Sequence, residues 1–188
     1  LPIHRLIRNV SGFDGERLLA DMAADFEVEP FVECGPAGRR GMAAAMRLLR
    51  GQGRHVLGVL LGDGVYRTAL LRGEERLASM TDVHPVLRRL DVTILHKMVL
   101  EKHLGIDAAK LAAGDHVEYV KAAADDPVEA AERVRRGECQ AAFFVNATRV
   151  DEVEAVAEAG QCMPQKSTFF YPKVYTGLVM QDVAAGLE

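Results

Sequence analysis

The chain lacks the paired cysteines of a disulfide-stabilised fold. Its 188 residues include three cysteines, Cys34, Cys139 and Cys162, and no two of them are close in the sequence. An odd number of widely separated cysteines provides no disulfide framework, and a reducing compartment is the simplest context for such residues. We therefore expect a cytoplasmic protein.

Long apolar runs and an excess of positive charge are also missing. The longest apolar stretch, Val56–Leu61, contains Gly58 and is far too short to cross a bilayer. The formal net charge is −4, because 27 acidic residues outnumber 23 lysines and arginines. A protein that neutralises many phosphates of a nucleic acid usually has a basic face. The sequence therefore predicts neither a membrane nor a nucleic-acid partner.

Well-known catalytic and cofactor motifs are absent as well. The sequence contains no nucleophile elbow, dinucleotide-binding fingerprint, zinc-protease histidine pair or calcium loop. His96 and His103 share one face of a predicted helix, but no nearby acid or cysteine completes a metal-binding set. The sequence thus indicates no metal site and no evident cofactor, and it leaves open whether the chain is an enzyme.

The composition that is present is that of a packed domain. Hydrophobic residues make up 49% of the chain and charged residues 27%, which is ordinary for a globular protein that buries a core. The chain opens at Leu1 without a methionine, so we expect further sequence to precede it. We expect residues 1–188 to form a single α/β domain, the C-terminal half of a longer protein; the alternative is a division into 1–80 and 81–188.

In the first half the clearest element is a hairpin. Two apolar runs, Val56–Leu61 and 65–71, are joined by Gly62, Asp63 and Gly64, and an Asp-Gly pair supplies the positive backbone angles of a tight turn. Before the hairpin we expect a strand at 3–10, a helix at 16–24 with Asp14 as N-cap, a strand at 26–30, a loop at 34–41 and a helix at 42–50.

The second half alternates between helical and strand patterns. The longest helix is predicted at 92–103, with Asp91 as N-cap and Gly105 as its stop. After this helix we expect strands at 117–120 and 141–145, helices at 128–136 (after Asp126 and Pro127) and 150–159, and an extended region at 168–180. Such an order usually packs as parallel strands with right-handed crossovers. The fold class we expect is α/β: a mixed sheet with an antiparallel hairpin in the first half and βαβαβ parallel units in the second, helices covering the sheet.

The sequence offers candidate ligand-binding residues in two segments and at the start of the first expected strand. In open parallel sheets, ligands bind beyond the carboxyl ends of strands, which here indicates the corner after strand 141–145. The alternative is that Asn146 or Thr148 only caps the helix that starts at Val150. The segment 163–173 holds lysines, hydroxyls and aromatics between two prolines, which suits a pocket wall or, equally, a packed strand whose lysines face water. The candidate ligand-binding residues are Asn146, Thr148, Arg149, Lys166, Ser167, Lys173, His4 and Arg5.

Several segments resemble a known family. Residues 151–160, 163–173 and 176–179 are similar to the end of the bacterial and archaeal family called domain of unknown function 1015, and residues 1–6 and 90–96 resemble earlier landmarks of it. The resemblance implies a protein roughly twice this length, with an upstream half similar to ParB-like domains, a group that includes free-serine kinases. The Asp-Gly-His-His-Arg segment of that upstream half is missing here. Residues 63–67 read Asp-Gly-Val-Tyr-Arg, so no catalytic role is carried onto them.

The resemblance implies a function only in outline. This chain would contribute one wall of a cleft for a nucleotide or a phosphorylated small metabolite, with the missing N-terminal half of the same protein as its partner. The alternative is a non-catalytic structural or protein-interaction module. The sequence leaves a homo-oligomer open.

Overall fold

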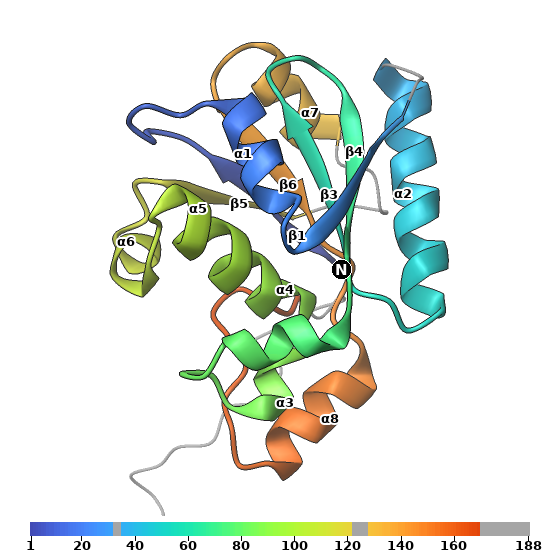
Figure 1. Ribbon diagram of the computed structural model, residues 1–188, viewed down its shortest axis with the longest axis vertical. Coiled ribbons are helices and arrows are strands. Elements are labelled where there is room, and N and C mark those ends of the chain that lie inside the picture. The colour runs from blue at the N-terminus through green and yellow to red at the C-terminus, as the bar shows by residue number, and fades with distance from the viewer. Residues whose placement is uncertain (32–34, 122–127, 170–188) are drawn as a thin grey trace, which may run out of the picture.

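A computed structural model describes residues 1–31, 35–121 and 128–169 (Figure 1). Within these residues six strands form one sheet, in the order β2-β4-β3-β6-β1-β5. Their bounds are β1 Ile3–Ile7, β2 Phe26–Pro30, β3 Val56–Leu61, β4 Tyr66–Leu71, β5 Val117–Lys121 and β6 Ala141–Phe144. Every pair of neighbouring strands is antiparallel. The α/β class is therefore confirmed, whereas the mixed sheet with parallel βαβαβ units is wrong.

The position of β1 explains the error. Strand β5, helix α7 (Val128–Arg135) and β6 follow one another along the chain, as expected for a crossover unit. Both strands are antiparallel to β1, so they run in the same direction as each other, but β1 lies between them. The N-terminal strand thus separates two strands that the order of elements suggests are neighbours. Of the extended region expected at 168–180, residues 168 and 169 are not in a strand and the rest lies outside the described residues.

Helices cover both faces of the sheet (Figure 1). Side chains of a strand alternate between the two faces. One face packs its core residues, such as Ile7 and Phe143, against α1 (Gly15–Met22) and a long helix that runs through α4 (Asp91–Ile94), the π-helical η2 (Leu95–Glu101) and α5 (Lys102–Leu104). The other face, which includes Leu6 and Phe144, packs against α2 (Gly35–Gly51) and α7.

Beyond one end of the sheet lies a smaller group of helices. It comprises η1 (Glu74–Ser79), α3 (Pro85–Arg88), the start of α4, and α8 (Val150–Glu158). The short helix α6 (Ala108–Ala113) is not part of this group and precedes β5 in the chain. Leu90, Val92 and Val156 form a separate small core there. This group places α8 and the N-terminus of α4 beside the C-terminal end of α2.

Several local predictions are confirmed. The carboxylate of Asp14 accepts from the backbone N–H of Arg17 at 3.0 Å and caps α1. Strands β3 and β4 form the expected hairpin, and Gly64 has a φ of 74°, the left-handed region that favours glycine.

Two local predictions are wrong. Helix α2 begins at Gly35, so most of the expected loop at 34–41 is helical. A proline is tolerated in the first turn of a helix, and a Cβ at Gly41 would lie 3.1 Å from the ring of Phe31, which gives that glycine a packing role instead of a loop role. The N-cap of α4 is Leu90, and Asp91 lies within the first turn, where its carboxylate contacts other side chains.

Gly58 provides a test of how α2 lies against the sheet. A Cβ built at this position on β3 would lie 2.8 Å from the sulfur atoms of Met42 and Met46 and 3.0 Å from Cβ of Phe144. We expect Gly58→Ala to lower the free energy of unfolding by roughly 1–3 kcal/mol, because overpacking forces α2 outward. Urea denaturation would measure the loss. Gly62→Ala is the matched control, since nothing lies within 4 Å of its Cβ; equal effects of the two substitutions would contradict the packing.

Candidate functional site

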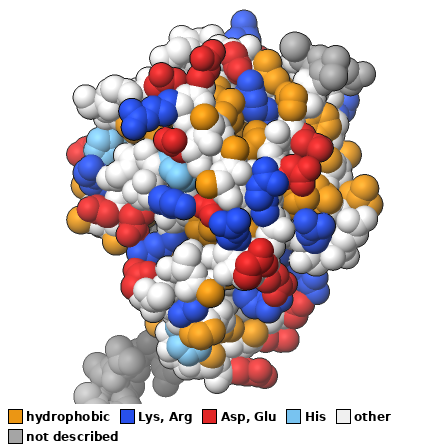
Figure 2. Space-filling model, in the orientation of Figure 1, with side chains coloured by type: hydrophobic (Ala, Val, Ile, Leu, Met, Phe, Trp, Pro, Cys, Tyr) orange, Lys and Arg blue, Asp and Glu red, His pale blue; other side chains and the backbone are white. Residues whose placement is uncertain are grey.

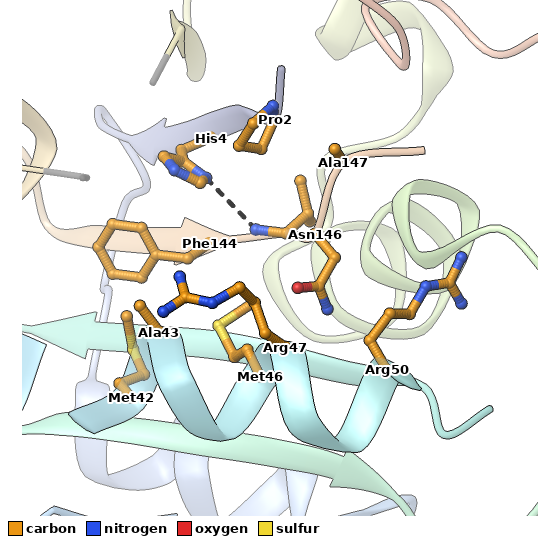
Figure 3. A pocket seen from close by; sticks show the side chains of 11 residues that line it. Pro2, His4, Met42, Ala43, Met46, Arg47, Arg50, Phe144, Asn146 and Ala147 are labelled. Atoms are coloured by element: carbon orange, nitrogen blue, oxygen red, sulfur yellow. Dashed lines mark hydrogen bonds between the residues drawn. The ribbon is translucent and has the colours of Figure 1, made fainter. Parts of the chain in front are cut away.

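A cavity of about 270 Å³ lies between α2 and the sheet, where β1 begins and β6 ends (Figure 3). Because these two strands are antiparallel neighbours, the start of β1 and the end of β6 lie side by side at the same end of the sheet. Helix α2 covers that end of the sheet, and the residues that follow β6 close the cavity on a further side. Segments from the two halves of the sequence therefore build one concave site.

Most of the cavity wall is apolar. Met42 and Met46 lie one turn apart on α2 and face the sheet, and Phe144 ends β6 opposite them. The ring of His4 packs edge-on against the ring of Phe144, with centroids 5.1 Å apart at an interplanar angle of 76°. Pro2 completes the wall at the start of the chain. An apolar or planar group of a ligand would be well matched to these side chains.

His4 contributes a neutral polar group to this wall. Its Nδ1 accepts from the backbone N–H of Val145 at 3.4 Å, which assigns the ring proton to Nε2. That Nε2 atom is buried and has no hydrogen-bond partner within the described residues. Burial lowers the pKa of His4 to about 4, with a smaller contribution from the charge of Arg5. The ring is thus an uncharged donor at neutral pH.

Two further polar groups face the cavity. The side-chain nitrogen of Asn146 is buried and, like Nε2 of His4, is without a partner in the described part of the chain. Arg47 lies on the exposed side of α2 and makes no hydrogen bond or ion pair with the described residues. Arg50, one turn further on, differs because its guanidinium pairs with Asp91 at 3.7 Å and with Glu152. Arg47 therefore gives the mouth of the cavity a positive charge that no carboxylate of the described residues pairs with.

Arg5 lies on the opposite face of the sheet and is almost completely buried. Its guanidinium donates to the backbone oxygens of Ile3 and Lys166, the second at 3.0 Å, and lies 5.4 Å from the ring centroid of Tyr119. No carboxylate pairs with it among the described residues, and burial lowers the pKa of Arg5 to about 10. Arg5 also affects His96 of η2: burial, together with the charge of Arg5, lowers the pKa of His96 to about 3.

The structure brings together only part of the predicted site. His4 and Asn146 line the cavity, whereas Arg149 borders a neighbouring pocket and Arg5 lies on the other face. Lys166 supplies its backbone oxygen to Arg5, and its φ of 55° places it in the left-handed region. Lys173 lies outside the described residues.

The two predicted hydroxyls hold a loop in place. The Thr148 hydroxyl donates to the backbone oxygen of Ser167 at 2.8 Å, and the buried Ser167 hydroxyl donates to that of Pro164 at 2.6 Å. The capping alternative is wrong for both Asn146 and Thr148, because Arg149 occupies the N-cap of α8. There the carboxylate of Glu152 accepts from the Arg149 backbone N–H at 2.8 Å.

Sequence reasoning missed the contribution of α2 to the site. Met42, Met46, Arg47 and Arg50 recur at helical spacing, which indicates a face but not what that face covers. Among the residues that the structure describes, no group of three or more histidine, cysteine or acidic side chains is placed to hold a metal ion. Within the same residues no helix has the length and apolar character needed to span a membrane.

The family model described as "Protein of unknown function (DUF1015)" matches residues 1–93. The match includes β1, α2 and the β3–β4 hairpin, and hence Pro2, His4 and the α2 side of the cavity; Phe144 and Asn146 lie beyond it. It also ends before the segment from 151 onward, where the resemblance in the sequence is most specific. No curated protein and no solved structure matches the chain.

The buried histidines predict a loss of stability in mild acid. The pKa values of His4 and His96 are about 4 and about 3 in the folded chain, against 6.5 as the ordinary value. Between pH 6.5 and 5 the unfolded chain binds protons that the folded chain does not, so stability is full above pH 6.5 and falls as the pH drops. For each histidine, the free energy of unfolding should fall by at most about 1.4 kcal/mol for each unit that the pH is lowered.

Urea denaturation at several pH values between 7.5 and 5 would measure this dependence. The double variant His4→Gln/His96→Gln should show a clearly shallower fall over the same interval, whatever its absolute stability. A double variant whose free energy of unfolding falls as steeply as that of the wild type would show that other groups cause the loss.

Proposed function

Because residues 1–93 belong to the DUF1015 family, whose description names no activity, we propose a function from the cavity itself. The chain binds a compact metabolite that has an apolar or planar body and one anionic group, of which a phosphorylated small metabolite is the best-matched class. The observation that carries this proposal is that Arg47, which has no partner among the described residues, lies at the mouth of a largely apolar cavity. Within the same residues, polar atoms of His4 and Asn146 in this cavity also lack a partner.

The unpartnered atoms support a ligand that forms hydrogen bonds. Leaving a buried polar atom without a partner costs roughly 1–3 kcal/mol, and native proteins rarely keep such atoms without a reason. Two of them, Nε2 of His4 and Nδ2 of Asn146, belong to side chains that line the same cavity. Both are donors, so each fits an acceptor oxygen or nitrogen on the body of a ligand.

The size and charge of the site narrow the class of ligand. A volume of about 270 Å³ is slightly below the range of ordinary small-molecule pockets, which begins at roughly 300 Å³, so the ligand is compact. On the face seen in Figure 2, basic side chains lie among acidic ones instead of forming one positive field. This mixed charge supports a small anion held by one guanidinium more than a nucleic acid held by many.

The wider setting forms part of the same proposal. A nucleotide or a phosphorylated metabolite bound mainly by an upstream half of the protein would use this cavity as one wall of its cleft. In that arrangement Arg47 contacts the phosphate, because a guanidinium forms paired hydrogen bonds with phosphate oxygens.

The test is a thermal-shift screen of the full chain against phosphorylated sugars, nucleoside monophosphates and amino acids, followed by calorimetry on each hit. A ligand at 100 times its dissociation constant should stabilise the folded state by about 2.7 kcal/mol. Arg47→Gln should leave the unliganded melting temperature unchanged, because the side chain is exposed and pairs with none of the described residues. It should weaken binding of the anionic hits at least about tenfold.

Arg40→Gln is the matched control, since Arg40 is also exposed on α2 but does not line the cavity. It should bind as the wild type does. Equal affinity of the wild type and Arg47→Gln for every hit would contradict the proposal. A screen without a single hit would also contradict it and would favour the non-catalytic interaction module.

A further inference from the structure

A second cluster of charged side chains lies on the far side of Arg50 from the cavity. His55 Nδ1 is 2.9 Å from Oδ1 of Asp91, and the Arg50 guanidinium pairs with that carboxylate and with Glu152. The side chains of His55 and Asp91 are 7% and 5% exposed, and those of Arg50 and Glu152 are 13% and 18% exposed. Four segments therefore contribute to one largely buried ionic network: the residue directly before β3, α4, α2 and α8.

This network is incompletely satisfied. Nε2 of His55, Oδ2 of Asp91 and Nε of Arg50 are all buried, and none has a hydrogen-bond partner in the described part of the chain. A buried network that serves only to join helices stabilises best when each of its polar atoms is paired. One of these atoms, Nε2, belongs to a histidine that the Asp91 carboxylate orients, an arrangement that fixes which ring nitrogen is available to a ligand.

The network borders a separate pocket of about 280 Å³. Arg50, His55, Arg89, Arg149, Asp151 and Glu152 supply its polar lining. Arg89 pairs with Glu74 at 2.9 Å, and Arg149 pairs with Asp151 at 2.8 Å. All four of these side chains are more than half exposed, and such surface pairs contribute little to stability. Either guanidinium can therefore exchange its carboxylate for an oxyanion at small cost.

From this arrangement we propose that the pocket is a second binding site, for a phosphate or phosphomonoester group. Arg89 and Arg149 hold the oxyanion at the mouth, and the His55–Asp91 pair lies at its inner wall. With Nδ1–H donated to Asp91, Nε2 of His55 accepts a hydrogen bond from a phosphate hydroxyl. The site does not depend on the cavity beneath α2, from which Arg50 separates it, so either can exist without the other.

The acidic residues of the pocket give the proposal a further consequence. Asp151 competes with the ligand for Arg149, whereas Glu152 is occupied by Arg50 and by the backbone N–H of Arg149. Asp151→Asn should therefore tighten phosphate binding several-fold, because it frees the guanidinium and removes a negative charge from the mouth of the pocket.

The experiment uses inorganic phosphate as probe on the full chain, at constant ionic strength and pH 7, and observes the histidine ring signals by NMR. One ring signal should shift saturably with phosphate, and that signal should be missing in His55→Gln. The double variant Arg89→Gln/Arg149→Gln should weaken binding at least about tenfold. Both arginines are exposed, so this variant tests the site even if His55→Gln does not fold.

Arg40→Gln is the control, because Arg40 is exposed on α2 and lines neither this pocket nor the cavity beneath α2. It should bind phosphate as the wild type does. The proposal is overturned if no ring signal saturates, or if the double variant binds as the wild type does. Loss of phosphate binding in Arg47→Gln alone would also overturn it, and would place the anion in the cavity beneath α2, which leaves the proposed function intact.

Discussion

Strand β1 runs between β6 and β5 and is antiparallel to both. This pairing brings the first residues of the chain beside Phe144, Val145 and the residues that follow them. Because neighbouring side chains of a strand face opposite ways, β1 presents His4 to the cavity beneath α2 and Arg5 to the other face. Both candidate sites lie at the end of the sheet where β1 begins and β6 ends.

The burial of Arg5 is the electrostatic consequence of that position. A buried cation without a carboxylate is costly, and here two backbone oxygens and the ring of Tyr119 are the partners within the described residues. One of these oxygens belongs to Lys166, which adopts a positive φ. Burial is the main cause of the low pKa values of His4 and His96, and the charge of Arg5 lowers both further. The segment around Lys166 is thus tied to the strand that starts the chain.

The sequence predicts the elements whose causes are local. The Asp14 cap, the Gly64 turn and the apolar run of β3 depend on residues within a few positions of one another, and these predictions are confirmed. The insertion of β1 between β5 and β6 is decided by contacts more than a hundred residues apart, so no local pattern could reveal it.

The candidate site divides in the same way. Polar residues next to strand ends indicated Asn146 and His4, and the cavity contains both. The sequence indicates only that Arg47 belongs to a helix, because its place at the cavity depends on what α2 covers. Asp91 looked like a helix cap, and its pairing with His55 depends on the packing of α4 against the start of β3. Thr148 and Ser167 were predicted as ligands, but their hydroxyls are used within the chain.

The central claim is that a small anionic metabolite occupies the cavity between β1, β6 and α2. Its most direct test is the NMR signal pair of the Asn146 side-chain amide, observed while the strongest hit of the ligand screen is added. The account predicts that this pair shifts saturably, with the same dissociation constant as calorimetry gives, while the amide of the exposed Gln52 does not move. An Asn146 amide that stays unchanged at saturating ligand would contradict the account.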